Sequence, residues 1–271
     1  MPVRPQELLR IAARVLDDAA PRFVEGVGAP KAVVKGHGDF ATELDLELER
    51  RIAAELRART GIDVHGEEFG GPPLDTGVVW VLDPIDGTYN YAAGLPLAGM
   101  LLGLVVDGRP AAGLIWLPLL NLRYAATADG PVCCNDVELP RLGGATLADT
   151  MIGFGAFNVD GPGRNVGTAR ESVSGQRRFA ILGALSRVSG RVRMQGSTGV
   201  DLAFVAAGVL GGAVVFGHHP WDNVPGIALV RAAGGVVTDL AGAPWTLTSG
   251  SVLAAAPGVH AELVELIRGC A

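Results

Sequence analysis

The sequence is poor in cysteine, and its three cysteines form no recognisable framework. Cys133 and Cys134 are adjacent, and the total is odd. Domains held by disulfide bonds usually show an even set of spaced cysteines, and cysteine-based metal sites usually show a C-x-x-C pair. The sequence therefore suggests neither class, and we expect a protein of the reducing cytoplasm. The five histidines offer no zinc-binding spacing either.

Long hydrophobic runs are also missing. The longest uncharged apolar run, residues 202–217, is shorter than the roughly 20 residues that a membrane-spanning helix needs. Gly211 and Gly212 interrupt it, which favours a buried helix, a turn and a strand. The N-terminal segment has apolar residues at helical spacing, but charges such as Glu7 and Arg10 interrupt the apolar core that a signal peptide requires. We expect no membrane partner.

Positive charge is scarce as well. The chain has 22 Lys and Arg against 28 Asp and Glu, a net charge of −6, which disfavours nonspecific attraction to nucleic acid. One basic segment, residues 176–193, suggests the alternative hypothesis of an RNA or protein partner. Nucleic-acid binders usually show interleaved aromatic residues or a wholly basic domain, so a solvated helix face is the better interpretation. The segment's arginines are Arg177, Arg178, Arg187, Arg191 and Arg193.

Two halves differ in the pattern of their elements. Residues 1–147 predict an α+β half, with helices over 4–27 and 43–59 and an antiparallel meander over 78–134. Residues 148–271 alternate strands and helices, which is an α/β order. No linker separates the halves, so the division can also be a seam within one domain. In the second half we expect strands near 150–155, 191–195, 211–216, 234–240 and 251–256 and helices near 177–188, 199–208, 223–233 and 259–268.

The segment WVLDPIDGT, residues 80–88, carries more acidic groups than a turn needs. Asp83 and Asp86 follow an apolar strand, and with the carbonyl of Ile85 they offer three hard oxygen ligands of the kind that Mg²⁺ prefers. The backbone N–H groups of Gly87 and Thr88 can then contact phosphate at the start of a helix. The alternative interpretation is an Asx turn followed by a helix N-cap.

Two further acidic positions are ambiguous when they are taken alone. Glu67 and Glu68 lie in a glycine-flanked loop, where paired glutamates are usually only solvated charge. Asp222 follows Trp221 and precedes a predicted helix with Pro225 in its first turn, which is typical of an N-cap. Spacing alone therefore assigns these residues no chemistry.

Taken together, these segments resemble a known family. GEE at 66–68, WVLDPIDGT at 80–88 and WDNVPGIALVRAAGG at 221–235 are similar to the signature segments of the inositol monophosphatase family of metal-dependent phosphatases, and KGHGDFATELDLELE at 35–49 resembles a fourth. The resemblance implies a layered α-β-α-β-α sandwich of the inositol monophosphatase and fructose-1,6-bisphosphatase type. It also implies a homodimer, inhibition by lithium, and a site with two or three Mg²⁺ ions at the junction of the halves.

The resemblance also implies roles for individual residues. In the family, water bound to the metal attacks phosphorus directly, and two ions roughly 3.5–4 Å apart can hold both the attacking and the leaving oxygen. Glu67 and Thr88 match the pair that orients and deprotonates this water. Asp45 and Lys35 match residues at the edge of the metal site, although Asp45 also fits a capping box with Thr42. The matched metal ligands are Glu67, Asp83, Ile85, Asp86 and Asp222, and the matched substrate contacts are Asp86, Gly87, Thr88, Thr198 and Asp222.

Val215 departs from the pattern of the family. Members specific for inositol phosphate typically carry a glutamate seven residues before the Trp-Asp aspartate, and a valine cannot accept a hydroxyl hydrogen. We therefore expect a Mg²⁺-dependent phosphomonoesterase whose substrate is a small phosphorylated alcohol, with inositol monophosphate as the first choice. Histidinol phosphate, fructose 1,6-bisphosphate and 3′-phosphoadenosine phosphate are alternatives. The spacing DxxDGT disfavours a covalent aspartyl phosphate, which needs DxDxT, and no P-loop motif is present.

Overall fold

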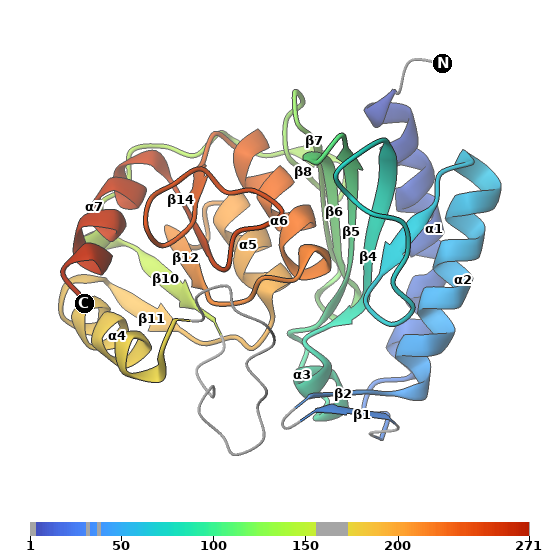
Figure 1. The fold of residues 1–271 in the computed structure, drawn as a ribbon, viewed down its shortest axis with the longest axis horizontal. Coiled ribbons are helices and arrows are strands. Elements are labelled where there is room, and N and C mark those ends of the chain that lie inside the picture. The colour runs from blue at the N-terminus through green and yellow to red at the C-terminus, as the bar shows by residue number, and fades with distance from the viewer. Residues whose placement is uncertain (1–3, 31–32, 37–38, 156–172, 271) are drawn as a thin grey trace.

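Helical layers and β-sheets alternate through the molecule (Figure 1). The computed structural model describes residues 4–30, 33–36, 39–155 and 173–270, and of residues 33–36 and 39–40 it describes the backbone only. Helices α1 (Pro5–Glu25) and α2 (Glu43–Thr60) cover one face of a seven-stranded sheet, and α5 (Thr198–Ala206) and α6 (Pro220–Ala232) cover the other. A five-stranded sheet follows, and then α4 (Gly175–Val188) and α7 (Pro257–Arg268). The predicted α-β-α-β-α sandwich is confirmed.

The large sheet has the order β3-β4-β5-β6-β7-β8-β9. The meander from β4 onward is antiparallel, as predicted, whereas β3 pairs in parallel with β4. A two-stranded sheet of β1 (Val33–Gly36) and β2 (Asp39–Ala41) precedes it in the sequence. The strands of the large sheet are β3 (Val64–Gly66), β4 (Val78–Asp86), β5 (Gly99–Val106), β6 (Arg109–Leu117), β7 (Leu122–Thr127), β8 (Cys133–Cys134) and β9 (Val137–Glu138). The short helices of this half are α3 (Thr88–Ala92), η1 (Pro118–Leu120) and η2 (Leu147–Asp149).

Strand β4 is apolar along nearly its whole length because both of its faces are covered. Trp80 and Leu82 pack with α1 and α2, while Val81 packs into the core beside α5 and α6. Successive side chains of a strand point to opposite faces, so a strand between two helical layers needs apolar residues at every position. This burial carries into the end of the strand, where the acidic residues begin.

The small sheet is mixed and has the order β11-β10-β12-β14-β13. Strand β10 pairs in parallel with β11 and β12, whereas β14 is antiparallel to β12 and β13. The predicted alternation of strands and helices is confirmed, including the helix and strand within residues 202–217. The strands are β10 (Met151–Phe154), β11 (Arg191–Arg193), β12 (Gly212–Val215), β13 (Val236–Thr238) and β14 (Val252–Ala255).

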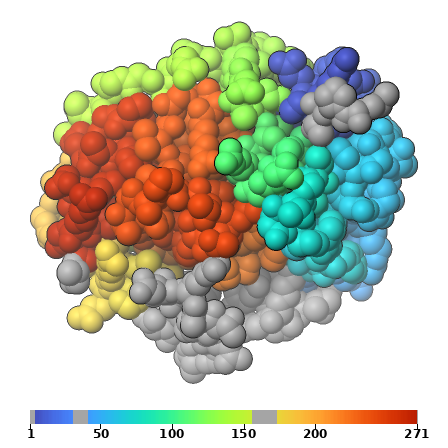
Figure 2. Space-filling model, turned by 45° about the horizontal axis from the view of Figure 1, so that its top comes forward, coloured from blue at the N-terminus to red at the C-terminus, as the bar shows by residue number. Residues whose placement is uncertain are grey.

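Helices of the second half fill the space between the sheets. In the space-filling view the C-terminal half, in orange and red, lies directly against the cyan and green N-terminal half (Figure 2). The proposed division at residues 147 and 148 falls within η2, between β9 and β10, and α6 packs on both sheets. Across the described residues, no helix combines the length and apolar character that a bilayer crossing demands.

Candidate metal and phosphate site

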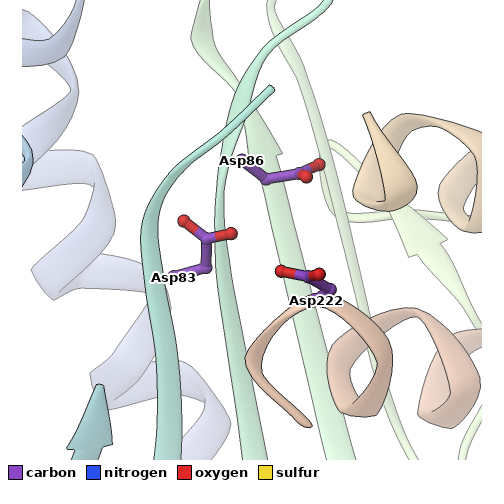
Figure 3. Close-up of side chains that lie close together, drawn as sticks. All are labelled: Asp83, Asp86 and Asp222. Carbon is purple, nitrogen blue, oxygen red and sulfur yellow. The ribbon is translucent and has the colours of Figure 1, made fainter. Parts of the chain in front are cut away.

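Three carboxylates from distant parts of the sequence converge between the two sheets. Oxygens of Asp83, Asp86 and Asp222 all lie within 4.8 Å of one another. Figure 3 shows the first two on the end of β4 and the third on the first turn of α6, with all three side chains directed at a common space. Asp83 and Asp86 are 2% and 7% exposed, so solvent cannot screen their charges. The convergence of these three predicted residues is what a divalent cation site requires.

A β-bulge brings Asp83 and Asp86 to the same side of β4. Residues three apart in a regular strand point to opposite faces of the sheet. The register of β4 on β5 shifts between Asp83, which pairs with Leu101, and Asp86, which pairs with Gly99. A bulge inserts an extra residue and redirects the side chain after it. The amide of Ile85 also donates to Asp83 Oδ1 at 2.9 Å, so the predicted Asx turn is present within the acidic site.

The segment before and at the start of α5 holds Asp86. Its Oδ2 accepts hydrogen bonds from the Ser197 hydroxyl and from the Gly199 amide, the latter at 2.7 Å, and the Thr198 amide donates as well. Burial raises the pKa of the Asp86 carboxyl to about 6, although these hydrogen bonds oppose the shift. The predicted residue Thr198 is thus beside the site, and its contact with substrate stays a prediction.

Asp83 is the residue on which the acidic charges act most strongly. Burial raises its pKa well above the usual range, and the charges of Glu67, Asp86 and Asp222 raise it further. Glu67 is half-buried after β3 and is not one of the three carboxylates within 4.8 Å. Its charge nevertheless raises the pKa of both Asp83 and Asp86. The four predicted carboxylates therefore form one electrostatic group.

Gly87 and Thr88 turn the chain from β4 into α3. Gly87 has φ +80°, and a Cβ there would lie 2.8 Å from the Leu97 carbonyl oxygen, so only glycine fits. The Thr88 hydroxyl donates to the Ile85 carbonyl at 3.1 Å. A carbonyl oxygen has two lone pairs, so this contact leaves Ile85 one for another partner. The proposed ligand and the proposed water-orienting hydroxyl are direct neighbours.

Asp222 lies inside α6, and the N-cap interpretation of this residue is wrong. The helix begins at Pro220, three residues earlier than predicted, because proline is well suited to a first helical position. The N-cap is His219, and Pro225 lies within the helix. Val215 ends β12 and is 2% exposed. A Cβ on Gly217 would contact both Asp222 and Val215, at 3.7 and 3.9 Å, so Val215 lies close to the acidic group.

Asp45 and Lys35 remain less defined. The predicted capping box is confirmed, because Asp45 Oδ2 accepts from the Thr42 amide at 2.8 Å and the Thr42 hydroxyl accepts from the Asp45 amide at 3.4 Å. Asp45 is not among the converging carboxylates of the described residues. Lys35 lies in β1, where its side chain is outside the described part of the structure. The metal-edge roles of both residues stay predictions.

Sequence reasoning missed residues that hold the site through contacts across long sequence separations. Ser197 caps α5 by accepting from the Val200 amide at 3.1 Å and also donates to Asp86. Its only sequence signal is that of an ordinary helix N-cap. Asn90 Nδ2 donates to the carbonyls of Leu97 and Gln195, at 2.7 Å each, and so joins the loop after α3 to the loop before α5.

The basic segment is not a continuous charged face. Arg178 is 3% exposed, and its guanidinium lies 4.3 Å from the centre of the Phe216 ring, so the prediction that it belongs to a solvated face is wrong. Arg177 is half-buried and donates to the Cys270 carbonyl at 3.2 Å. Arg187, Arg191 and Arg193 are exposed.

The donor set fits a hard divalent cation. All three converging side chains are carboxylates, and no histidine or cysteine belongs to this group within the described residues. Burial, together with the charges of neighbouring carboxylates, raises the pKa of Asp83 and Asp86, and a cation between them would offset the cost of their charges. Mg²⁺, Ca²⁺ and Mn²⁺ are the common biological cations that match oxygen ligands of this kind.

Comparison with known proteins agrees with this geometry. The chain is 55% identical to the inositol-1-monophosphatase ImpA of Mycolicibacterium smegmatis over 267 residues. The match covers 98% of this chain and 94% of that protein. The probable inositol 1-monophosphatase ImpA of Mycobacterium tuberculosis is also 55% identical, with 96% and 93% covered. The Nus factor SuhB of Escherichia coli is 31% identical and is covered to 96% in each chain. The solved Thermotoga maritima IMPase is 25% identical, with a TM-score of 0.84 over 97% of each chain.

The relatives with the higher identity are named as inositol 1-monophosphatases, which are phosphoric monoester hydrolases, so the predicted enzyme class is confirmed. A family model described as the inositol monophosphatase family matches residues 4–270, which is nearly the whole chain and includes every residue of the acidic site. By sequence, by fold and by its converging carboxylates, the chain belongs to the inositol monophosphatase family.

Proposed function

We propose that the chain is a Mg²⁺-dependent phosphomonoesterase that hydrolyses a small phosphorylated alcohol, with inositol monophosphate as its first substrate. The observation that carries this proposal is the convergence of the Asp83, Asp86 and Asp222 carboxylates within 4.8 Å. The names of the two mycobacterial relatives support the choice of substrate. A cytoplasmic location, a homodimer, two or three ions and sensitivity to Li⁺ are part of the same proposal.

The carboxylates and the Ile85 carbonyl would hold the metal ions. Divalent ions bound there would supply an activated water and neutralise charge on the phosphate. Glu67 lies beside Asp83 and is the group that takes the proton from the attacking water. The Thr88 hydroxyl, held by its donation to the Ile85 carbonyl, accepts a hydrogen bond from that water and orients it.

The phosphate lies at the turn that joins β4 to α3. Gly87 has no side chain, so its backbone and that of Thr88 can approach a phosphate closely. The buried ends of β4 and α6 exclude bulk water from one side of the acidic group. No histidine base is required by this arrangement.

Asp83→Asn tests the proposal directly. This substitution keeps the shape of the side chain and removes its charge, so we expect turnover to fall by roughly a thousandfold or more and Mg²⁺ binding to be lost. The variant should stay folded, because burial already disfavours the Asp83 charge in the absence of metal. Phosphate release assays with and without EDTA check this, with circular dichroism as the control for folding. Activity of the wild type that persists in EDTA would refute the metal requirement.

A substrate panel tests the choice of alcohol. We expect the highest kcat/KM for inositol 1-phosphate among inositol 1-phosphate, histidinol phosphate, fructose 1,6-bisphosphate, β-glycerophosphate and 3′-phosphoadenosine 5′-phosphate. A preference of a hundredfold or more for another compound would overturn inositol phosphate as the first substrate and would leave the phosphatase chemistry in place.

A second candidate function is the binding of RNA. It is favoured by the resemblance to a protein named Nus factor SuhB and by the exposed Arg187, Arg191 and Arg193. The net charge of −6 and the buried position of Arg178 count against it. Filter binding to single-stranded RNA at about 50 and 200 mM salt tests it, and binding that vanishes at the higher salt would indicate only nonspecific attraction.

A further inference from the structure

The buried carboxylate of Glu49, on α2, anchors the turn that carries Glu67. The turn spans residues 66–70 and is closed by two backbone hydrogen bonds between Gly66 and Gly70, at 2.9 and 3.1 Å. The backbone amides of Glu68 and Phe69, within this turn, donate to an acceptor outside it. Glu49 accepts from both of them, through Oε2 at 2.8 Å and through Oε1 at 3.0 Å.

The approach of Glu49 to this turn is close. Glu49 is 2% exposed, and a Cβ on Gly66 would lie 1.9 Å from its Oε1, so glycine at residue 66 makes the contact possible. The next residue of α2, Arg50, places its guanidinium 4.6 Å from the centre of the exposed Phe69 ring. Helix α2 therefore fixes the turn with two consecutive side chains.

This turn fixes Glu67 beside the acidic group. The Glu67 amide donates to the Leu82 carbonyl at 3.1 Å, which attaches the turn to β4 one residue before Asp83. The side chain of Glu67 then lies close enough to Asp83 and Asp86 for its charge to act on both. Glu67 is thus held by β4 through its own amide and by Glu49 through the two amides that follow it.

We propose that Glu49 is a positioning residue for Glu67 and sets the metal affinity of the site without touching metal or substrate. This inference rests on the proposed function, because it assigns Glu67 to the metal and the attacking water. A carboxylate can accept hydrogen bonds from both backbone amides. A glutamine side chain has only one acceptor oxygen, so its NH₂ group would face one of the two backbone N–H donors. Partners that orient metal ligands typically change metal affinity about tenfold to a hundredfold when they are mutated.

The test is Glu49→Gln in the full-length protein, with MgCl₂ titrated by calorimetry into metal-free enzyme. We expect the dissociation constant for Mg²⁺ to rise about tenfold or more. At saturating Mg²⁺ we expect kcat to fall while KM for inositol 1-phosphate stays within about twofold, because Glu49 does not reach the alcohol. Asp239→Ala is the control, because Asp239 Oδ1 also accepts two backbone amides, from Ala241 and Ala243 at 2.9 Å each, in a turn without site residues, and alanine removes that acceptor.

The outcomes separate this inference from the proposed function. Wild-type Mg²⁺ affinity and kcat in Glu49→Gln would overturn it, and so would an equal loss in Asp239→Ala, which would indicate a general structural effect. Mg²⁺ binding that survives in Asp83→Asn would instead refute the proposed metal site itself. Where Glu49→Gln fails to fold, Glu49→Asp keeps the charge and shortens the reach to the turn, and the same comparison of Mg²⁺ affinity decides.

Discussion

At the scale of single residues, Val215 is the position at which the substrate preference can be changed. It is almost fully buried, and both it and Asp222 border the space next to Gly217, where a glutamate could accept hydrogen bonds from ring hydroxyls of a leaving alcohol. A hydrogen bond from a hydroxyl to a carboxylate is worth about 1.5–3 kcal/mol, so Val215→Glu should raise kcat/KM for inositol 1-phosphate about tenfold or more relative to β-glycerophosphate. Steady-state kinetics on both substrates check this.

Val215→Gln is the control for that substitution, because it has nearly the same shape and no charge. An equal change on both substrates in Val215→Glu would show that residue 215 does not face the alcohol. Both variants should lose some stability, because a polar side chain placed at this buried position needs a partner.

Asp201 is a buried carboxyl that the proposed chemistry does not use. Burial, with a smaller contribution from the charge of Asp86, raises its pKa to about 7, although the hydrogen bond from Gln195 acts in the opposite direction. An unfolded chain releases this proton near pH 4, whereas the folded protein keeps it until about pH 7. The stability that Asp201 contributes therefore falls as the pH rises from about 4 to 7 and is lowest above that range.

Asp201→Asn should consequently stabilise the metal-free protein at pH 8 and have much less effect at pH 5. The upper limit of the gain is about 4 kcal/mol, because one unit of pKa corresponds to about 1.4 kcal/mol. The substituted amide keeps an oxygen that can accept from Gln195. Urea unfolding in EDTA at both pH values measures the difference, and an effect that does not change with pH would contradict the assignment.

At the scale of elements, α3 connects the two halves of the site. The Asn90 side chain on this helix donates to Leu97 and Gln195, which lie in loops from different halves of the chain. Asn90→Ala should destabilise the fold by about 1–3 kcal/mol, because two acceptors lose their donor. Asn90→Asp should be worse, since a carboxylate would face two carbonyl oxygens.

Asn90→Ala should lower kcat by more than the loss of folded protein alone explains. Gln195 precedes the segment that bonds Asp86, so we expect a lower kcat in Asn90→Ala even at temperatures where the variant is fully folded. Thermal unfolding and kinetics at about 15 °C check this pair of outcomes, and a wild-type kcat would show that the loop holds Asp86 without Asn90.

Sequence patterns predict the elements and acidic residues whose signals are local. The capping box of Thr42 and Asp45, the apolar strand β4 and the bulged pair Asp83 and Asp86 all depend on neighbours in the chain. The start of α6 predicted from the sequence is three residues late, because the prediction does not consider Pro220 as a first helical residue.

Contacts between residues far apart in the sequence leave no local signal of this kind. Glu49 bonds residues 19 and 20 positions away, and Asn90 bonds one 105 positions away. No local pattern around either residue predicts which distant groups its side chain bonds. Arg178 likewise lies in an arginine-rich segment, yet it is buried, and Phe216 from a distant part of the chain packs against its guanidinium.

At the scale of the whole molecule, metal binding should stabilise the entire fold. The carboxylates come from β4 in the first half and α6 in the second, so a cation between them joins both. Mg²⁺ at about a hundred times its dissociation constant should add about 2.7 kcal/mol to the free energy of unfolding. Thermal unfolding with and without Mg²⁺ measures this, and the increase should disappear in Asp83→Asn. A wild-type melting temperature that does not respond to Mg²⁺ would argue against a site shared by both halves.

The position of Asp222 in α6 also has a consequence for biosynthesis. A ribosome completes β4, with Asp83 and Asp86, long before it reaches residue 222. Until then the nascent chain has an incomplete set of carboxylates and lacks the helix that covers the second face of the large sheet. Domains generally fold as units during synthesis. A bound ion can therefore stabilise only the completed chain. Cellular magnesium should therefore influence how long the mature enzyme survives and have little influence on how its first half emerges.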